Sequence, residues 1–421
     1  MTLSEAKEPP SASVAITTPR AIIPPMRTPL PSPRPRVQAL LDDAIAVRRE
    51  LHHHAELSTE EWHTQGVILN WLNGIGAGDV RPAADTGATC LIRGARPGPN
   101  ILWRADIDAL PLAEETGLPF ACDSGEAMHA CGHDGHAAIA LALASALQAS
   151  RDTLAGTVRI AFQPAEEHVG GAARMVREGI MDDPAVDRVF GLHIWAPARV
   201  GTVLATPGPV FAAATHFRII VRGRGGHAAS PHETIDPIVV AAHVIVALQT
   251  VVSRAVSSED QAVFSIGRLQ GGVRGNIIPN EVMMSGTIRT FEPHVLRRVL
   301  TRVEEIVRGV TSAWGAEYQL DTSTLDAVVN DAESAALVAG VAAAYLGAEH
   351  VGQGRTTGGE DMCHFLRRAP GCYFMLGGGN PDRGITWPHH HPKFDFDEDC
   401  IGIGIELALR IVEAATGSKL N

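Results

Sequence analysis

A nine-residue segment, MHACGHDGH at residues 128–136, concentrates side chains that bind divalent metals. It places Cys131 and His133 on either side of a glycine, directly before a strongly apolar helical stretch. A thiolate and an imidazole that converge at a loop-to-helix junction suit a borderline-soft divalent ion. A helix start with a chance run of histidines and a buried free cysteine is the alternative explanation for this segment alone.

The segment FQPAEEH at residues 162–168 holds two adjacent carboxylates, Glu166 and Glu167. Adjacent acidic residues at a solvated helix start are common, so this pair does not identify a site by itself. Near a metal, however, one carboxylate can bind the ion while the other acts as a general base toward a water that the ion activates. The pair therefore has a function only together with other metal-binding side chains.

Three further segments supply candidate ligands or residues that support them. His193 lies at the end of an apolar strand-like run, where a lone histidine is more often a buried structural residue. Residues 389–391 are three successive histidines, which point in different directions, so at most two of them can serve one site. Asp106 and Asp108 follow another apolar run, and they could hold ligating imidazoles or lie near the metal.

Another group of polar residues lies in the middle of the chain. His227 in GRGGHAASPH can donate a hydrogen bond to a developing oxyanion, although such a glycine run is often only a turn. Arg289 lies in a strand-like run of small and apolar residues, a short distance after Asn276. An arginine in this setting indicates either a bidentate contact with a carboxylate or a structural ion pair.

The order of apolar runs and helical stretches predicts the fold that must position these side chains. The expected elements are strands at 101–103, 158–162 and 189–194, with helices at 137–147 and 171–178 between them. Strands that alternate with helices predict an α/β domain with a mostly parallel sheet. Sites in such sheets form at the carboxyl ends of the strands, where Glu166 and His193 are expected.

A second pattern interrupts this α/β domain. The expected elements are a strand at 216–222, a helix from 237, strands near 262–269 and 281–290, a helix at 293–314 and a strand at 318–320. Their order, β-α-β-β-α-β, is the ferredoxin-like plan. We therefore expect a disordered proline-rich tail at 1–36, an α/β domain formed by 37–205 and 322–421, and an inserted α+β domain at 206–321.

Composition excludes several classes of protein. The 421-residue chain carries a formal net charge of −12, which disfavours binding to nucleic acid or to an anionic membrane surface. It has no run of about 18 apolar residues, so we expect no membrane span. The tail lacks the apolar core of a secretory signal, and the six cysteines are too scattered for a disulfide-stapled domain. We expect a cytoplasmic protein.

Taken together, these segments resemble the dinuclear metallopeptidase family that includes aminoacylases and glutamate carboxypeptidases. The motifs that carry the resemblance, in chain order, lie at residues 128–136, 163–167, 225–232, 276–279 and 390–398. Five motifs in order are a specific signal, and the resemblance runs from about residue 48 to about residue 413. Within the family the chain is most similar to the amidohydrolase branch of hippurate hydrolase and the auxin-conjugate hydrolases, which shares Cys131 and the acidic form of the motif at Asp106.

This resemblance implies an architecture and a set of metal ligands. The fold would be a zinc-peptidase-like catalytic domain, interrupted by a ferredoxin-like lid that also forms a dimer. The residues on the branch's metal-ligand positions are Cys131, His133, Glu167, His193 and His390. The last ligand motif usually reads His-Asn-Pro or His-Ser-Pro, so in the HHP of this chain His391 is a rival to His390. We assign His52, His53 and His54 to structure or surface.

The resemblance also implies roles for the remaining candidates. Glu166 falls on the general base, and His227 falls on a histidine that stabilises the tetrahedral intermediate, often in the partner subunit's active site. Asn276 and Arg289 fall on positions that bind the substrate's carboxylate. Two divalent ions would be bound, and one thiolate with imidazoles and carboxylates fits Zn, Mn, Co or Ni.

The expected activity is that of a metal-dependent amidohydrolase that splits an N-acyl or N-aroyl amino acid into a carboxylic acid and an amino acid. A dipeptidase, a carboxypeptidase or a deacetylase of an N-acetylated intermediate would use the same site, and these alternatives stay open. A binding protein that has the fold without catalysis is a further alternative. The expected partners are the small-molecule substrate and a second copy of the chain, as a homodimer or a dimer-based oligomer.

Overall fold

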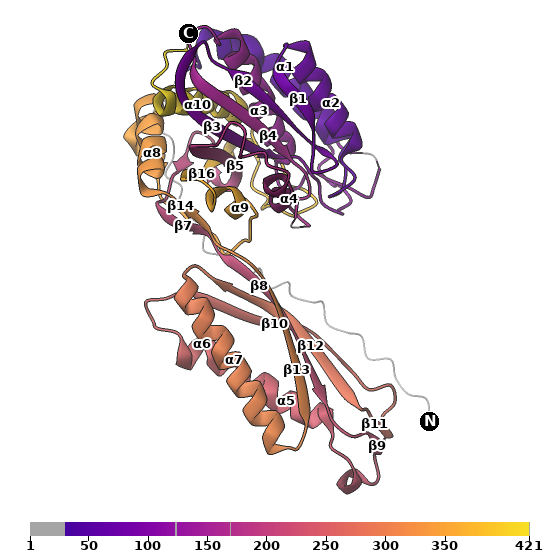
Figure 1. Ribbon diagram of the computed structural model, residues 1–421. Coiled ribbons are helices and arrows are strands. Elements are labelled where there is room, and N and C mark those ends of the chain that lie inside the picture. The colour runs from indigo at the N-terminus through magenta and orange to yellow at the C-terminus, as the bar shows by residue number, and fades with distance from the viewer. Residues whose placement is uncertain (1–29, 123, 169, 421) are drawn as a thin grey trace.

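An eight-stranded sheet forms the larger of two parts that lie end to end in the computed structural model, which describes residues 30–122, 124–168 and 170–420 (Figure 1). The central pairs β4–β3, β3–β5 and β5–β16 are parallel, whereas both pairs at the β1 edge are antiparallel. In spatial order the strands are β1 (Gly78–Ala83), β2 (Gly87–Arg93), β4 (Ala155–Gln163), β3 (Arg96–Asp106), β5 (Arg188–Arg199), β16 (Gly371–Gly379), β6 (Val203–Leu204) and β15 (Val351–Gly352). The predicted α/β fold with a mostly parallel sheet is confirmed.

Helices cover both faces of this sheet because its central strands are apolar on both sides. In β3, Ile101 and Trp103 face one hydrophobic cluster and Leu102 faces the other, as the two-residue period of a strand requires. The helices on the first face are α1 (Pro35–His53), α2 (Trp62–Gly74), α3 (His133–Ala149), α8 (Ala332–Leu346) and α10 (Asp399–Thr416). The short helices on the second face are α4 (Gly171–Arg177) and α9 (Cys363–Leu366).

Helix α3 matters most for the site because its first turn carries His133. It is apolar on nearly all sides and almost completely buried, as expected for a helix without a solvent-facing stripe. Gly135 permits the close packing of its first turn. A Cβ at this position would lie 2.5 Å from Ile194 Cδ1 and 2.6 Å from Phe396 Cζ, so a larger residue would push α3 off the sheet.

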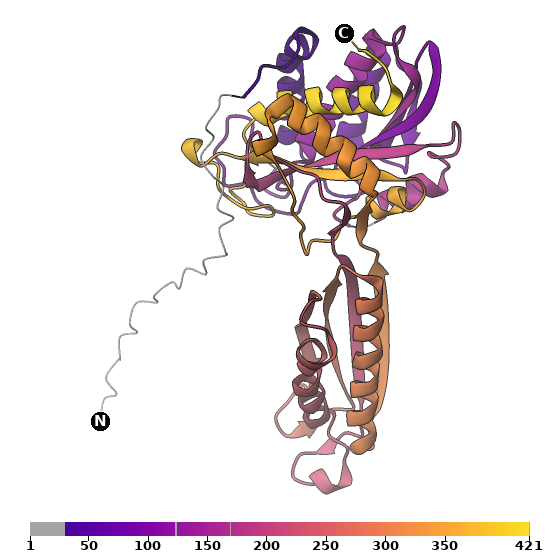
Figure 2. The same ribbon diagram turned by 90° about the vertical axis from the view of Figure 1, so that its left-hand side faces the viewer.

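The smaller part is a four-stranded antiparallel sheet with the order β10-β12-β8-β13. Its elements are β8 (Ala213–Arg222), β9 (Gly226–His227), α5 (Pro237–Leu248), α6 (Thr250–Ala255), β10 (Ala262–Gly271), β11 (Ile277–Ile278), β12 (Glu281–Thr290), α7 (Pro293–Ala313) and β13 (Glu317–Leu325). The β-α-β-β-α-β order and the strand arrangement are those of the ferredoxin-like plan. Helices α5, α6 and α7 cover one face of the sheet (Figure 2), and α7 buries Val295, Val299, Val303 and Val307 at a spacing of four residues.

Two short strands connect the parts. Strand β7 (Gly208–Phe211) pairs with β14 (Val328–Asn330). Strand β7 leads into the long strand β8, and the long strand β13 leads into β14. Strand β13 runs to Leu325 and therefore crosses the division that we expected at residues 321 and 322. The remaining helical turns are three-residue 3-10 segments at Pro231–Glu233, Ala348–His350 and Pro381–Arg383.

The N-terminal region is ordered earlier than expected. Helix α1 begins at Pro35, and Arg34 before it forms ion pairs with Glu406 (3.0 Å) and Glu413 (2.9 Å). The disorder predicted for the tail therefore does not apply to residues 30–36, and residues 1–29 lie outside the described part of the chain. Among the described residues, no helix is long and apolar enough to cross a membrane.

Candidate metal centre

The candidate ligands meet at the carboxyl ends of the central strands, as expected. Strand β3 ends at Asp106, which is paired with Gln163 at the end of β4, and Glu166 and Glu167 follow in the next turn. His193 differs from expectation, because β5 does not end there. The strand pairs with β16 as far as Arg199, so His193 projects from within the strand.

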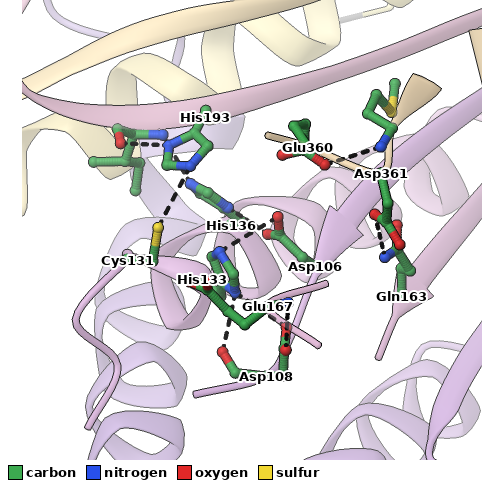
Figure 3. A network of polar contacts seen from close by, with 12 residues as sticks. Asp106, Asp108, Cys131, His133, His136, Gln163, Glu167, His193, Glu360 and Asp361 are labelled. Atoms are coloured by element: carbon green, nitrogen blue, oxygen red, sulfur yellow. Dashed lines mark hydrogen bonds and ion pairs between the residues drawn. The ribbon is translucent and has the colours of Figure 1, made fainter. Parts of the chain in front are cut away.

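Two pairs of candidate ligands already have the separation that one metal ion requires. Cys131 Sγ lies 3.6 Å from His193 Nε2, and Glu167 Oε1 lies 3.3 Å from His390 Nε2 (Figure 3 shows the first pair). Standard zinc–ligand lengths and tetrahedral angles give about 3.6 Å between sulfur and nitrogen, and about 3.3 Å between nitrogen and oxygen. His133, Glu166 and Glu167 form a further group whose ligand atoms lie within 4.8 Å of one another.

In His133 and His193, hydrogen bonds engage Nδ1 and leave Nε2 directed toward the other candidate ligands. His133 Nδ1 lies 3.0 Å from the Asp108 carbonyl oxygen, and His193 Nδ1 donates to the Ile194 carbonyl at 2.7 Å. His133 Nε2 and Glu167 Oε1 are both buried and make no hydrogen bond among the described residues, although Asp106 Oδ2 lies 3.5 Å from the first and His390 Nε2 lies 3.3 Å from the second. Buried polar atoms are rarely left unpaired, so these two atoms fit a metal ion as their missing partner.

His136 was not among the predicted ligands, and its contacts give it a supporting role. Its Nδ1 contacts Asp106 Oδ1, and its Nε2 accepts a hydrogen bond from the Ile194 N–H at 2.7 Å (Figure 3). Both nitrogens are therefore occupied. His136 lies in the same motif as His133. The sequence therefore identified the segment but did not show which of its histidines is a ligand and which supports one.

A buried ionic network that sequence reasoning missed lies beneath the ligands. Arg104 contacts Asp106 at 2.7 Å, Glu360 at 2.8 Å and Asp361 at 3.1 Å, and all four side chains are almost fully buried. Glu360 and Asp361 come from the loop before α9, about 250 residues from Arg104 in the chain. The acidic pair in GGEDM was the only sequence signal for this network.

The site carries more carboxylates than protein cations can balance. Burial raises the pKa of Glu166 well above its usual range, and the neighbouring Glu360 and Glu167 raise it further by repulsion. Burial lowers the pKa of His133, but Asp106 and Asp108 outweigh this effect and raise it to about 10. Such a concentration of negative charge fits a site for divalent cations.

The three successive histidines at residues 389–391 separate into different roles. His390 has a left-handed backbone (φ +62°), donates its N–H to the Ala130 carbonyl and places its imidazole beside Glu167. His391 instead stacks on Trp387 with a centroid distance of 4.2 Å. His389, which we had not singled out, lines the same cavity and accepts a hydrogen bond from the Ala196 N–H. The geometry thus favours His390 over His391.

A cavity of about 870 Å³ opens in front of these ligands and extends to the smaller domain. Arg289 reaches it from the end of β12, next to Ala214 of β8. Gly359 also lines the cavity and comes close to Arg289 because it has no side chain. A Cβ at Gly359 would lie 3.0 Å from an Arg289 guanidinium nitrogen. Arg289 is half-buried, forms no ion pair with any described residue, and burial lowers its pKa.

The structure does not bring His227 and Asn276 to this cavity within one chain. Strands β9 and β11 pair His227 with Ile277 at the far tip of the smaller domain (Figure 1). The nine residues of β8 from Ala214 to Arg222, which are eight steps of about 3.4 Å, alone span about 27 Å. His227 is exposed, and its Nδ1 accepts a hydrogen bond from the Ala229 N–H at 3.0 Å, so its neutral form carries the proton on Nε2.

Comparison with known proteins identifies the family of this chain. The model of peptidase family M20/M25/M40 matches residues 102–414. N-acetylcysteine deacetylase of Bacillus subtilis is 39% identical over 376 residues, which cover 88% of this chain and 97% of that protein. N-acyl-L-amino acid amidohydrolase of Geobacillus stearothermophilus is 41% identical over 284 residues, which cover 67% of this chain and 76% of that protein.

A solved structure shares the whole architecture. The Bacillus subtilis YxeP protein, described as a dinuclear metal-binding peptidase of the M20 family, superposes with a TM-score of 0.80 and 32% identity, covering 91% of this chain and all of that one. The resemblance drawn from the motifs is confirmed. The chain belongs to peptidase family M20/M25/M40 and is a hydrolase that acts on amide bonds.

Proposed function

We propose that the chain hydrolyses N-acyl or N-aroyl amino acids to a carboxylic acid and a free amino acid. The observation that carries this proposal is the unpaired, half-buried guanidinium of Arg289 in the wall of the cavity. A cation kept without a protein partner, in a cavity otherwise rich in carboxylates, selects a substrate that brings its own carboxylate. The named activities of the deacetylase and amidohydrolase relatives support the same class of substrate.

Two divalent ions fit the donor set, and we assign their binding to the predicted ligands. These are Cys131, His133, Glu167, His193 and His390. When bound, the ions polarise the scissile carbonyl and lower the pKa of the attacking water. The thiolate and imidazoles suit Zn, Co or Ni, and the carboxylates also suit Mn.

Glu166 is the proposed general base and acid. It lies at the cavity beside Glu167, and no other described side chain is hydrogen-bonded to its carboxylate. It takes a proton from water as the water attacks and returns this proton to the leaving amine. The high pKa that burial and, after it, the acidic neighbours impose on Glu166 favours the second of these transfers.

His227 and Asn276 take part in this proposal through a second copy of the chain. The free Nε2–H of His227 is suited to donate to the oxyanion of the tetrahedral intermediate, and it lies at the tip of a projecting domain. We propose a homodimer in which this tip, with Asn276 beside it, completes the partner's cavity and Arg289 binds the substrate carboxylate. The cytoplasmic location stays a prediction from the sequence.

The experiment that tests this function is a hydrolysis panel with metal-reconstituted enzyme. The substrates are hippurate, a set of N-acetyl amino acids, dipeptides, and the carboxamide counterpart of each. We expect the highest kcat/KM on an N-acyl amino acid and a marked loss on its carboxamide. Higher kcat/KM on dipeptides would favour the dipeptidase alternative, and no turnover of any substrate would favour the non-catalytic one.

A further inference from the structure

A second group of metal-binding side chains lies on the surface, apart from the cavity and its ligands. Glu50 comes from the last turn of α1, His54 is the residue directly after this helix, and His63 comes from the first turn of α2. Their side chains are 48%, 45% and 42% exposed. The two helices lie on the outside of the larger domain, remote from the smaller one (Figure 1).

The three side chains already converge at distances that suit one ion. The ligand atoms all lie within 4.8 Å of one another. Glu50 Oε1 is 3.6 Å from His54 Nε2 and 3.2 Å from His63 Nε2. Two ligands on one tetrahedral zinc ion are about 3.3 Å apart, so the two separations from Glu50 need to change by only a few tenths of an ångström.

The local structure places the backbone of these residues close together before any ion binds. Glu50 and His54 are four residues apart, and the end of α1 places them side by side. The carboxylate of Glu56 accepts hydrogen bonds from the backbone N–H groups of His63 and Thr64, both at 2.9 Å, which fixes the start of α2 against the end of α1. The carbonyl end of α1 also favours a positive charge beside it.

We propose that Glu50, His54 and His63 form a separate site for one divalent transition-metal ion. Two imidazoles and one carboxylate select Zn, Ni, Co or Cu over Mg or Ca, and solvent can supply the remaining ligand because all three side chains are exposed. The ion joins the end of α1 to the start of α2. His54 then has a binding role in place of the surface role that the sequence suggested.

The test is a count of bound zinc by equilibrium dialysis against ZnCl₂ and elemental analysis. His63→Ala and Glu50→Gln should each bind one zinc ion fewer per chain than the unsubstituted protein. The matched control is His294→Ala, because His294 is an exposed histidine in the smaller domain that pairs with Asp260 (3.7 Å). This control should bind as much zinc as the unsubstituted protein.

A second measurement separates this site from the catalytic one. Because the ion joins two helices, excess zinc should raise the Tm of the protein whose catalytic sites are already loaded, and His63→Ala should abolish this rise. Hydrolysis should stay unchanged in both variants. Equal zinc content in the unsubstituted protein, His63→Ala and Glu50→Gln would overturn the proposal, whatever the substrate panel shows.

Discussion

Replacement of Arg289 by methionine tests the substrate assignment most directly. The guanidinium lines the cavity opposite the metal-binding side chains, and it has no ion-pair partner among the described residues. The substitution keeps much of the aliphatic stem and leaves no protein carboxylate without its partner. We therefore expect the free energy of unfolding to change by about 0.5 kcal/mol or less.

The effect on catalysis should be much larger. A hydrogen bond between charged groups contributes roughly 1.5–3 kcal/mol, and a half-buried bidentate contact lies toward the upper part of this range. A loss of about 2–3 kcal/mol corresponds to a decrease in kcat/KM of about 30- to 160-fold. The decrease should apply to N-acyl amino acids and not to their carboxamides, which cannot form the ion pair.

The assay compares kcat/KM for one N-acyl amino acid and its carboxamide in the unsubstituted enzyme and in Arg289→Met. Arg289→Lys is the matched variant, and we expect it to recover part of the loss because it keeps the charge without the bidentate geometry. An equal loss on both substrates in Arg289→Met would refute the reasoning. It would mean that the arginine supports the cavity and does not recognise the carboxylate.

Three further predictions follow from the same geometry. Glu166→Gln should lower kcat by about 10²- to 10⁴-fold while elemental analysis finds as many metal ions per chain as in the unsubstituted enzyme. Undiminished turnover would contradict its role as a base. Mixing inactive Glu166→Gln with inactive His227→Ala, followed by subunit exchange, should restore activity, because one site of the mixed dimer then has both residues intact. No recovery of activity after verified exchange would argue against a site shared between subunits. Arg104→Met should lower the free energy of unfolding by about 3–5 kcal/mol, because Asp106 and Glu360 lose their buried partner. An unchanged midpoint of chemical denaturation would contradict a stabilising role of this ionic network.

Much of the fold was predictable because its signals are local. The apolar helix whose first turn carries His133, the strand that leads to Glu166 and the β-α-β-β-α-β order of the insertion all appear as periodicity within short windows. The hairpin of β1 and β2 was missed. Strand β1 lies at the sheet edge, is largely polar and contains Pro82, so it lacks the apolar alternation of a central strand. Helix α8 was also missed, although Asp331 caps its first turn through the Ser334 N–H.

The sequence by itself determined the types of chemical groups and their order along the chain: a thiolate and imidazole before a buried helix, a carboxylate pair after a strand, and a late histidine motif. Only the tertiary structure decided which of these groups meet. It distinguished His390 from His391, brought Arg104 to Glu360, and placed His227 far from the cavity of its own chain. The physical reason is that residue type and periodicity depend on near neighbours, whereas the pairing of groups hundreds of residues apart depends on how the strands and helices pack.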